Sequence, residues 1–286
     1  MSVELRDVKR RISSTRRIRQ MTSAMQKVSS ARLAHDRRSM EHSRHYTERI
    51  VQLLRVLCFA TGDADHPFLS RRHTGRGTLV LVFGSDRGLC GGYNRALIDA
   101  FDRFRRARTE TTPVTAVTVG RIPARRLNRL GVRVERTVPQ PTRAARAETL
   151  DRLAADVMEG YDHRRYADVH VLYTRFATAL HQVPVTERVL SVTCESAKPG
   201  PFRAALFEPA AGVILERLLP EYVRQLIDHA FLNALASEDA ARQQAMARAS
   251  ENAGELLRDL SRRYSRLRQE TITTEMLEIA GAGVNN

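Results

Sequence analysis

The fold is decided around residues 78–107, which read TLVLVFGSDRGLCGGYNRALIDAFDRFRRA. The apolar, β-branched run at 78–83 predicts a buried strand, and the pattern after the glycines predicts a helix. Residues 113–120 and 167–173 predict two more strands, and 181–192 predict one at an edge. Helical patterns cover residues 94–107, 121–131 and 146–161. Because strands and helices alternate, we expect an α/β domain with a mostly parallel sheet covered by helices.

The turn at 84–94 has the order of a nucleotide-binding loop, with glycines between a strand and a helix, but not its chemistry. A phosphate-binding P-loop needs Gly-Lys-Ser/Thr, and none of the three lysines follows a glycine. The glycine spacing does not fit the dinucleotide pattern Gly-x-Gly-x-x-Gly either, and a carboxylate in the turn would repel phosphate. We interpret the turn as a structural corner whose glycines adopt positive φ or allow close approach. Its residues are Asp86, Arg87, Gly88, Gly91 and Gly92.

Catalytic and metal-binding motifs are missing from the rest of the chain. His-Glu-x-x-His and Gly-x-Ser-x-Gly do not occur, and His35, His42 and His45 fall on an arginine-rich helix without a carboxylate pattern to complete a metal site. We therefore expect no catalytic residue, no cofactor and no metal. Cys58, Cys90 and Cys194 are far apart and odd in number, which predicts reduced thiols in a cytoplasmic protein.

Both ends of the chain predict long helices. Residues 4–58 contain no proline or glycine, and Leu5, Val8, Ile12 and Thr15 follow a 3-4-3 spacing. Ile18, Met21, Met25 and Val28 repeat this spacing after one short step. This pattern is typical of a coiled-coil seam that is locally overwound.

The C-terminal part repeats the pattern with smaller residues. An apolar stripe runs from Leu219 to Leu267, and its middle is mostly alanine and serine, which allows another helix to approach closely. Because the chain leaves and re-enters the same middle domain, the two terminal helices are expected to pair antiparallel, with Val28 near Ala241 and the last residues projecting beyond the N-terminus. The segments are 1–60 (first helix), 61–205 (central α/β domain) and 206–286 (second helix).

The net charge of +15 calls for a negative partner, which could be nucleic acid, a membrane surface or an acidic protein. More than half of it lies in residues 1–60, which hold 14 basic and 5 acidic residues. This stretch has no interleaved aromatics and no nucleic-acid motif. A basic helical nucleic-acid-binding protein nevertheless stays open from composition alone, as does a nucleotide enzyme that uses the middle domain.

Four motifs in order resemble the γ subunit of the F1 sector of F-type ATP synthases, over nearly the whole chain. The motifs are LRDVKRRISSTRRIRQMTSAMQKVSSARL (5–33), SDRGLCGGYN (85–94), FEPAAGVILERLLPEYV with ALASEDAARQQAMARASENAGELL (207–223, 234–257) and YSRLRQETITTEMLEIAGAG (264–283). The resemblance implies an antiparallel pair of terminal helices and a Rossmann-like central domain.

The resemblance also implies the role. The chain would be the non-catalytic central-stalk rotor, which couples ion-driven rotation of the c-ring to ATP synthesis or hydrolysis at the β-subunit sites. Its partners would be the α and β subunits, the ε subunit and the c-ring, with no nucleic acid. It would associate peripherally with the cytoplasmic face of the bacterial membrane through the complex.

Residues expected to contact the α/β hexamer come from the basic helix and from positions that match the family motifs. They are Arg10, Arg16, Arg17, Arg19, Met25, Lys27, Arg242, Arg268, Gln269 and Thr273. Ser23, Gln26, Lys27, Gln243 and Ala280 depart from residues that are frequent in the family.

Overall fold

The computed structural model describes residues 3–61, 66–69, 77–108, 113–192 and 207–284. Its elements, in chain order, are α1 (Val3–Thr61), β1 (Thr78–Phe83), α2 (Tyr93–Arg106), β2 (Val114–Val119), α3 (Arg121–Arg129), β3 (Val134–Val138), α4 (Arg146–Asp162), β4 (Asp168–Phe176), β5 (Gln182–Leu190) and α5 (Ala211–Val284). By their contacts the residues form two compact units, Met1–Ser30 with Arg242–Asn286, and Ala31–Ala241. We call them the helix-end unit and the sheet unit. The predicted segments 1–60, 61–205 and 206–286 stay a prediction.

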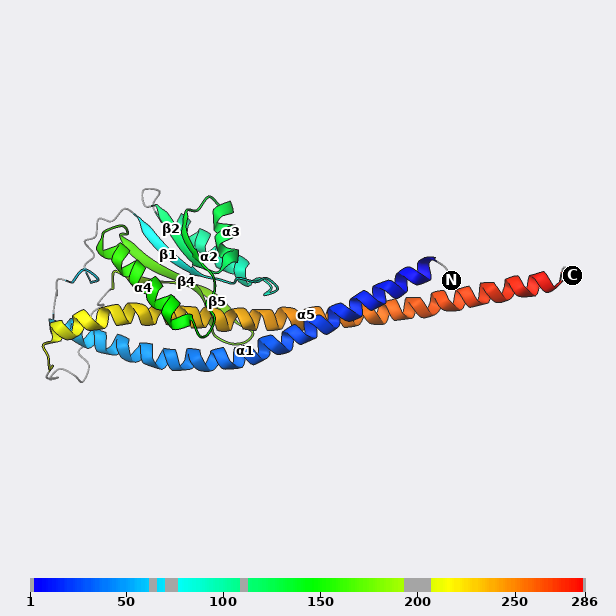
Figure 1. Cartoon of the computed structure of the whole chain (residues 1–286), viewed down its shortest axis with the longest axis horizontal. Coiled ribbons are helices and arrows are strands. Elements are labelled where there is room, and N and C mark those ends of the chain that lie inside the picture. The colour runs from blue at the N-terminus through cyan, green and yellow to red at the C-terminus, as the bar shows by residue number, and fades with distance from the viewer. Residues whose placement is uncertain (1–2, 62–65, 70–76, 109–112, 193–206, 285–286) are drawn as a thin grey trace. The chain divides into compact units, whose positions relative to one another are not determined.

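The sheet unit contains a five-stranded sheet in the order β3-β2-β1-β4-β5 (Figure 1). All neighbouring pairs are parallel except β4 with β5, which run antiparallel. The prediction of a mostly parallel sheet with an added edge strand is therefore confirmed. Strand β3 was not predicted, because its sequence, VERTV, has three exposed residues and no apolar run.

Both faces of the central strand β1 are buried, as its continuous apolar sequence requires. Val80 and Val82 face α2 and α3, where Leu97 and Phe101 are fully buried. Burying each of these two side chains contributes about 1.5–3 kcal/mol. The alternate β1 residues face the opposite core, to which α4, α5 and the end of α1 contribute.

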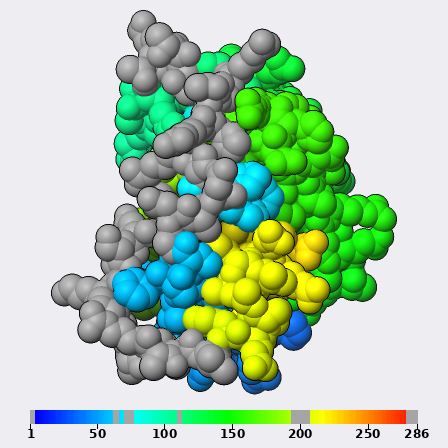
Figure 2. Space-filling view, turned by 90° about the vertical axis from the view of Figure 1, so that its left-hand side faces the viewer, coloured from blue at the N-terminus to red at the C-terminus, as the bar shows by residue number. Residues whose placement is uncertain are grey.

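The opposite core fixes the long helices to the sheet. Leu57 of α1, Tyr161 of α4 and Leu219 of α5 are each completely buried in it. Figure 2 shows the yellow beginning of α5 between the light-blue end of α1 and the green residues of α4. These parts of the two terminal helices therefore belong to the same packed body as the sheet.

The helix-end unit has a seam that differs from the predicted one. Leu5, Val8, Thr15, Thr22 and Ser29 are buried, which continues a regular heptad spacing. Ile18, Met21 and Val28 are instead 55%, 59% and 52% exposed, so the predicted short step is wrong. The hydroxyl of Thr22 donates to the carbonyl oxygens of Ile18 (3.0 Å) and Arg19 (3.1 Å) of its own helix. Its polar atom is thereby satisfied, so a residue that looks unsuited to a seam can be buried there.

The two helices of this unit run antiparallel, as expected. Arg263 Nη2 of α5 lies 2.6 Å from Glu4 Oε1 near the start of α1, and α5 continues from there to Val284. Figure 1 shows this red end of α5 running past the N-terminus. In the predicted C-terminal stripe, Leu256 is wrong, because it is half exposed while Leu257 lies against α1. In the described residues, no helix combines the length and apolarity that a membrane span needs.

Candidate functional site

The glycine-rich corner lies at the carboxyl end of β1, in the middle of the sheet. In parallel sheets of this kind, ligands bind at the carboxyl ends of the strands, where the strand order reverses. The corner therefore lies where a nucleotide phosphate would be expected. Its own side chains occupy that position.

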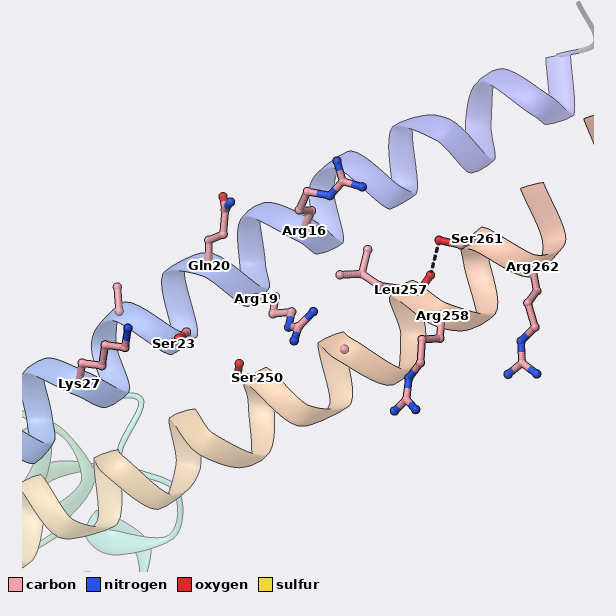
Figure 3. A pocket seen from close by; sticks show the side chains of 12 residues that line it. Arg16, Arg19, Gln20, Ser23, Lys27, Ser250, Leu257, Arg258, Ser261 and Arg262 are labelled. Carbon is pink, nitrogen blue, oxygen red and sulfur yellow. Dashed lines mark hydrogen bonds between the residues drawn. The ribbon is translucent and has the colours of Figure 1, made fainter. Parts of the chain in front are cut away.

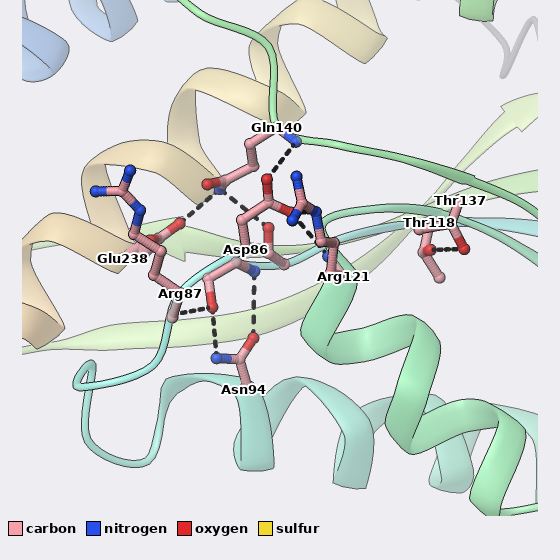
Figure 4. Close-up of polar contacts among 10 residues, drawn as sticks. Asp86, Arg87, Asn94, Thr118, Arg121, Thr137, Gln140 and Glu238 are labelled. Atoms are coloured by element: carbon pink, nitrogen blue, oxygen red, sulfur yellow. Dashed lines mark hydrogen bonds and ion pairs between the residues drawn. The ribbon is translucent and has the colours of Figure 1, made fainter.

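Asp86 supplies the negative charge at this place (Figure 4). Its Oδ1 accepts a hydrogen bond from the backbone N–H of Arg121 (2.9 Å), the first residue of α3, and its Oδ2 accepts one from the N–H of Gln140 (3.2 Å). Helix N-termini bind phosphates through such N–H groups and the helix dipole. Asp86 thus uses the donors that a phosphate would need.

A second set of bonds closes the corner on itself. Asn94 Nδ2 donates to Ser85 Oγ (2.6 Å), and Asn94 Oδ1 accepts from the Ser85 N–H (3.2 Å). Ser85 Oγ in turn donates to the carbonyl oxygen of Arg87 (2.9 Å). Ser85 and Asn94 are both buried. Since buried polar groups are costly when unpaired, this set specifies one conformation of the turn.

The corner is also tied to α5 within the sheet unit. Gln140 Nε2 donates to the carbonyl oxygen of Gly84 (3.0 Å) and to Glu238 Oε2 (2.6 Å), and the Tyr93 hydroxyl donates to the carbonyl oxygen of Ala234 (3.1 Å). Figure 4 shows Gln140 between the corner and Glu238. The corner therefore has a structural role, because its hydrogen bonds join the sheet to the long C-terminal helix.

An ion pair between an exposed arginine and a buried carboxylate makes the corresponding connection to α1. Asp36 is only 3% exposed, and Arg143 Nη2, from the segment between β3 and α4, lies 3.0 Å from its Oδ1. Neither residue was predicted as important from the sequence. Asp36 continues the heptad spacing of the seam, which could have indicated a buried carboxylate in need of a partner.

The glycines of the corner were only partly understood from the sequence. Gly91 has a φ of 57°, as predicted, but Gly88 and Gly92 have ordinary φ values and open space around the position of a Cβ. For these two residues the prediction was wrong. Leu89 takes up a positive φ of 64° instead, and the closest backbone approach is at Gly120, where a Cβ would lie 2.5 Å from the Gly84 carbonyl oxygen.

In the helix-end unit, a basic groove lies between α1 and α5, with a volume of about 1090 Å³. The described residues that line it include no carboxylate. The lining residues are Arg16, Arg19, Gln20, Ser23, Ala24 and Lys27 of α1 and Ser250, Gly254, Leu257, Arg258, Ser261 and Arg262 of α5. Figure 3 shows Arg19 and Ser23 pointing from α1 toward α5. Gly254 leaves room for the Arg19 side chain. A Cβ added at Gly254 would already be in van der Waals contact with Arg19 Nε, at 3.6 Å.

Most of the predicted hexamer-contact residues have exposed side chains. The exposed ones are Arg10, Arg16, Arg17, Arg19, Lys27, Arg268, Gln269 and Thr273. Met25 is half-buried, and Arg242 is 8% exposed. The sequence reading missed Arg258 and Arg262, which bring positive charge from α5 to the same groove as Arg16 and Arg19. These two arginines could be placed beside Arg16 and Arg19 only once the register of the antiparallel helix pair was known.

The cysteines depart from the expectation of reduced thiols. Cys58 is disulfide-bonded, so the prediction is wrong for this residue, whereas Cys90 is buried and takes part in no disulfide. The isolated positions of the cysteines in the sequence could not reveal that Cys58 is bonded. Cys194 lies outside the described residues.

Comparison with known sequences gives the family. The ATP synthase family profile matches residues 4–284. The ATP synthase gamma chain of Heliobacterium modesticaldum is 35% identical over 285 residues, which cover 97% of each chain. That of Geobacter metallireducens is 34% identical, with 96% of each chain covered. The chain belongs to the ATP synthase gamma-chain family.

A solved structure agrees with this gamma-chain assignment at the level of the fold. A rotor chain of the Euglena gracilis mitochondrial ATP synthase aligns with a TM-score of 0.64 and 16% sequence identity, over 94% of this chain and 99% of that one. The predicted resemblance to the gamma chain and the predicted architecture are therefore confirmed. The nucleic-acid-binding alternative has no support from the comparisons.

Proposed function

We propose that this gamma chain is the central-stalk rotor of an F-type ATP synthase. In this role it turns inside a ring of α and β subunits and couples ion-driven rotation of a c-ring to ATP synthesis or hydrolysis at the β sites. The observation that carries the proposal is the helix-end unit, in which two antiparallel helices present uncovered cationic and apolar side chains along their outer faces.

The outer face of α1 supports a protein partner that surrounds it. Ile18, Met21 and Val28 are each more than half exposed, and they alternate with exposed arginines. Apolar side chains at helical spacing, left uncovered on a helix that is already paired, indicate a further contact surface. The surrounding positive charge favours an acidic partner surface, which fits the proposed position inside the hexamer.

A rotor must hold its ring without locking to it. Exposed ion pairs contribute only about 0–1 kcal/mol each, and arginines attract acidic groups over distances near the Debye length of about 8 Å at physiological ionic strength. Many weak attractions of this kind change gradually as a rod turns. The helix-end unit has this surface, whereas a deep apolar interface would resist rotation.

The sheet unit supports a non-catalytic role. The donors at the carboxyl edge of its sheet are already bound by Asp86, and the corner joins the sheet to α5. We infer that this unit is a platform that carries torque between the long helices and the ε subunit and c-ring. In a bacterial cell the complex would place it peripherally, at the cytoplasmic face of the membrane.

The test is assembly with α and β subunits, followed by ATP hydrolysis and its inhibition when the c-ring is blocked. Reversing Arg16, Arg17 and Arg19 to Glu turns attraction to an acidic surface into repulsion. We expect at least a tenfold loss of assembly or of coupling. Single changes at the other proposed contacts, Arg10, Met25, Lys27, Arg242, Arg268, Gln269 and Thr273, should have smaller effects of the same kind.

The matched control reverses Arg125, Arg126 and Arg129 on α3, which are also exposed and give the same change in net charge. Assembly and coupling should stay near those of the unaltered chain. Equal losses in both variants would show that net charge matters and not this surface, and a fully coupled Arg16/Arg17/Arg19 variant would contradict the proposed contact. ATP hydrolysis by the isolated chain would contradict its non-catalytic role.

A further inference from the structure

A second basic hollow lies in the sheet unit, at the edge of the sheet opposite the Asp86 corner. It has a volume of about 630 Å³. Gly77, just before β1, and Pro113, just before β2, form part of its wall. Three arginines from three separate segments line it: Arg105 in the last turn of α2, Arg133 just before β3, and Arg165 just before β4.

Arg105 is incompletely satisfied. Its Nη2 donates to Asp102 Oδ1 (3.0 Å), but its Nε is buried and has no hydrogen-bond partner. A buried donor without an acceptor costs about 1–3 kcal/mol, and more when the group is charged. The residue that carries this cost is one of those that line the hollow.

The neighbouring Arg108 holds this end of α2 in place and is fully engaged. Its Nη1 donates to Thr78 Oγ1 (2.9 Å) and to Asp168 Oδ2 (2.7 Å), and its Nη2 lies 2.7 Å from His170 Nε2. These contacts join the end of α2 to β1 and β4. Arg105, one turn earlier, is thereby held at the hollow while Arg108 is not available to a ligand.

Among the described residues that line the hollow, Glu135 is the only carboxylate, and it is occupied. Its Oε2 accepts from the buried Tyr166 hydroxyl (2.7 Å). Burial, with the hydrogen bond to Glu135 and its charge, raises the pKa of Tyr166 to about 12, so that this hydroxyl stays a donor near neutral pH. The Arg165 guanidinium lies 5.8 Å from the centre of the Tyr166 ring. Over the described lining residues, three arginines against one carboxylate leave a positive charge.

We propose that this hollow binds a phosphate-bearing ligand through Arg105, Arg133 and Arg165. Guanidinium groups match phosphate oxygens in a forked geometry, and ligand pockets typically measure about 300–1,000 Å³. The ligand is a free phosphate compound or a phospholipid headgroup. This site takes no part in the proposed contact with the hexamer, so it is an additional activity of the sheet unit.

Calorimetric titration of the full chain with pyrophosphate tests the site. Arg105→Ala and Arg133→Ala should each weaken binding at least tenfold. Arg106→Ala is the matched control, because Arg106 is the next residue of α2 and binds the same Asp102 (2.7 Å) without lining the hollow. Unchanged affinity in Arg105→Ala, or an equal loss in Arg106→Ala, would overturn the proposal.

Glu135→Gln gives a test that misfolding cannot imitate. The amide can still accept from Tyr166, and removing the negative charge should tighten pyrophosphate binding about fivefold. Sedimentation with phosphatidylglycerol vesicles, compared with phosphatidylcholine vesicles, separates the two sources of phosphate. Arginine-dependent sedimentation identifies a headgroup site, and pyrophosphate binding without sedimentation identifies a free phosphate site. Binding of neither probe would overturn the proposal.

Discussion

The sheet unit and the helix-end unit are stabilised by different chemistry. In the sheet unit, large side chains such as Phe101, Tyr161 and Leu219 are completely buried, and buried polar bonds join the corner to α5. In the helix-end unit, the seam of α1 buries Thr15, Thr22 and Ser29. The first unit therefore has one strongly specified structure, whereas the second has a narrow, weakly stabilising seam and a large outer surface.

This difference fits the proposed rotor, in which the sheet unit carries torque and the helix-end unit turns against a surrounding ring of subunits. Helices of this kind gain most of their stability from packing an apolar face, and the seam of the helix-end unit offers little such area. We infer that the proposed hexamer supplies part of the missing stabilisation. Substitutions that remove packing or hydrogen bonds should accordingly lower the free energy of unfolding strongly in the sheet unit and only slightly in the helix-end unit.

The largest expected effect is at Gly120, between β2 and α3. Its φ is 112°, and an added Cβ would lie 2.5 Å from the Gly84 carbonyl oxygen. Gly120→Ala should lower the free energy of unfolding by more than about 3 kcal/mol, through backbone strain and displacement of β1. Urea unfolding of the full chain measures this. Gly88→Ala, with open space around it, should change stability by less than about 1 kcal/mol, and a similar loss in both variants would contradict the explanation.

A smaller effect is expected from the polar bonds of the corner. Asp86→Ala leaves the N–H groups of Arg121 and Gln140 without their carboxylate acceptor, which should cost about 2 kcal/mol. Asp86→Asn should recover part of this loss, because an amide oxygen still accepts one bond. The control is Arg87→Ala, whose exposed side chain should contribute little. An Asp86→Ala chain as stable as the control would show that the corner does not hold the sheet together.

The same comparison explains what could be predicted from the sequence. Strands β1, β2 and β4 could be predicted because each is a local run of apolar residues. The corner could be predicted because its glycines separate a strand from a helix. The exposed strand β3 was not found, since it is held by backbone pairing with β2. The seam of α1 was misplaced after Thr15 because Thr22 and Ser29 are buried instead of the apolar Ile18 and Met21.

The candidate sites depend even more on tertiary structure. The dense basic residues of the first helix indicated Arg16 and Arg19, but only the pairing of α1 with α5 adds Arg258 and Arg262 to the same groove. Positive φ appears at Leu89 and not at Gly88, since strain is set by how the turn is held and not by residue type alone. The arginines of the second hollow come from three separate segments of the chain and share no motif.

The third prediction concerns pH and the sheet unit. Burial lowers the pKa of His229 on α5; Glu187 and Glu48 oppose the shift, and Arg175 and Arg44 add to it. Below the ordinary histidine pKa the unfolded chain binds a proton that the folded chain does not, so stability falls as the pH drops. His229→Gln should reduce the stability difference between pH 7.5 and pH 5.5, measured by urea unfolding. An unchanged pH dependence would contradict this role.

The smallest effect is expected in the helix-end unit, at the ion pair of Glu4 with Arg263. Its side chains are 55% and 60% exposed, so their coupling should be about 0.2–1 kcal/mol and should weaken with added salt. A double-mutant cycle of Glu4→Gln and Arg263→Gln, followed by amide exchange at residues 5–15 of α1, measures it. The control cycle uses Asp259 and Arg262, whose 2.7 Å pair lies within α5 alone. That pair stabilises α5 whether or not α1 is beside it, so its removal should leave exchange in α1 nearly unchanged. A coupling well above 1 kcal/mol for Glu4 and Arg263 would mean that the paired helix ends are held by specific polar contacts, as the sheet unit is, and the contrast between the two units would fail.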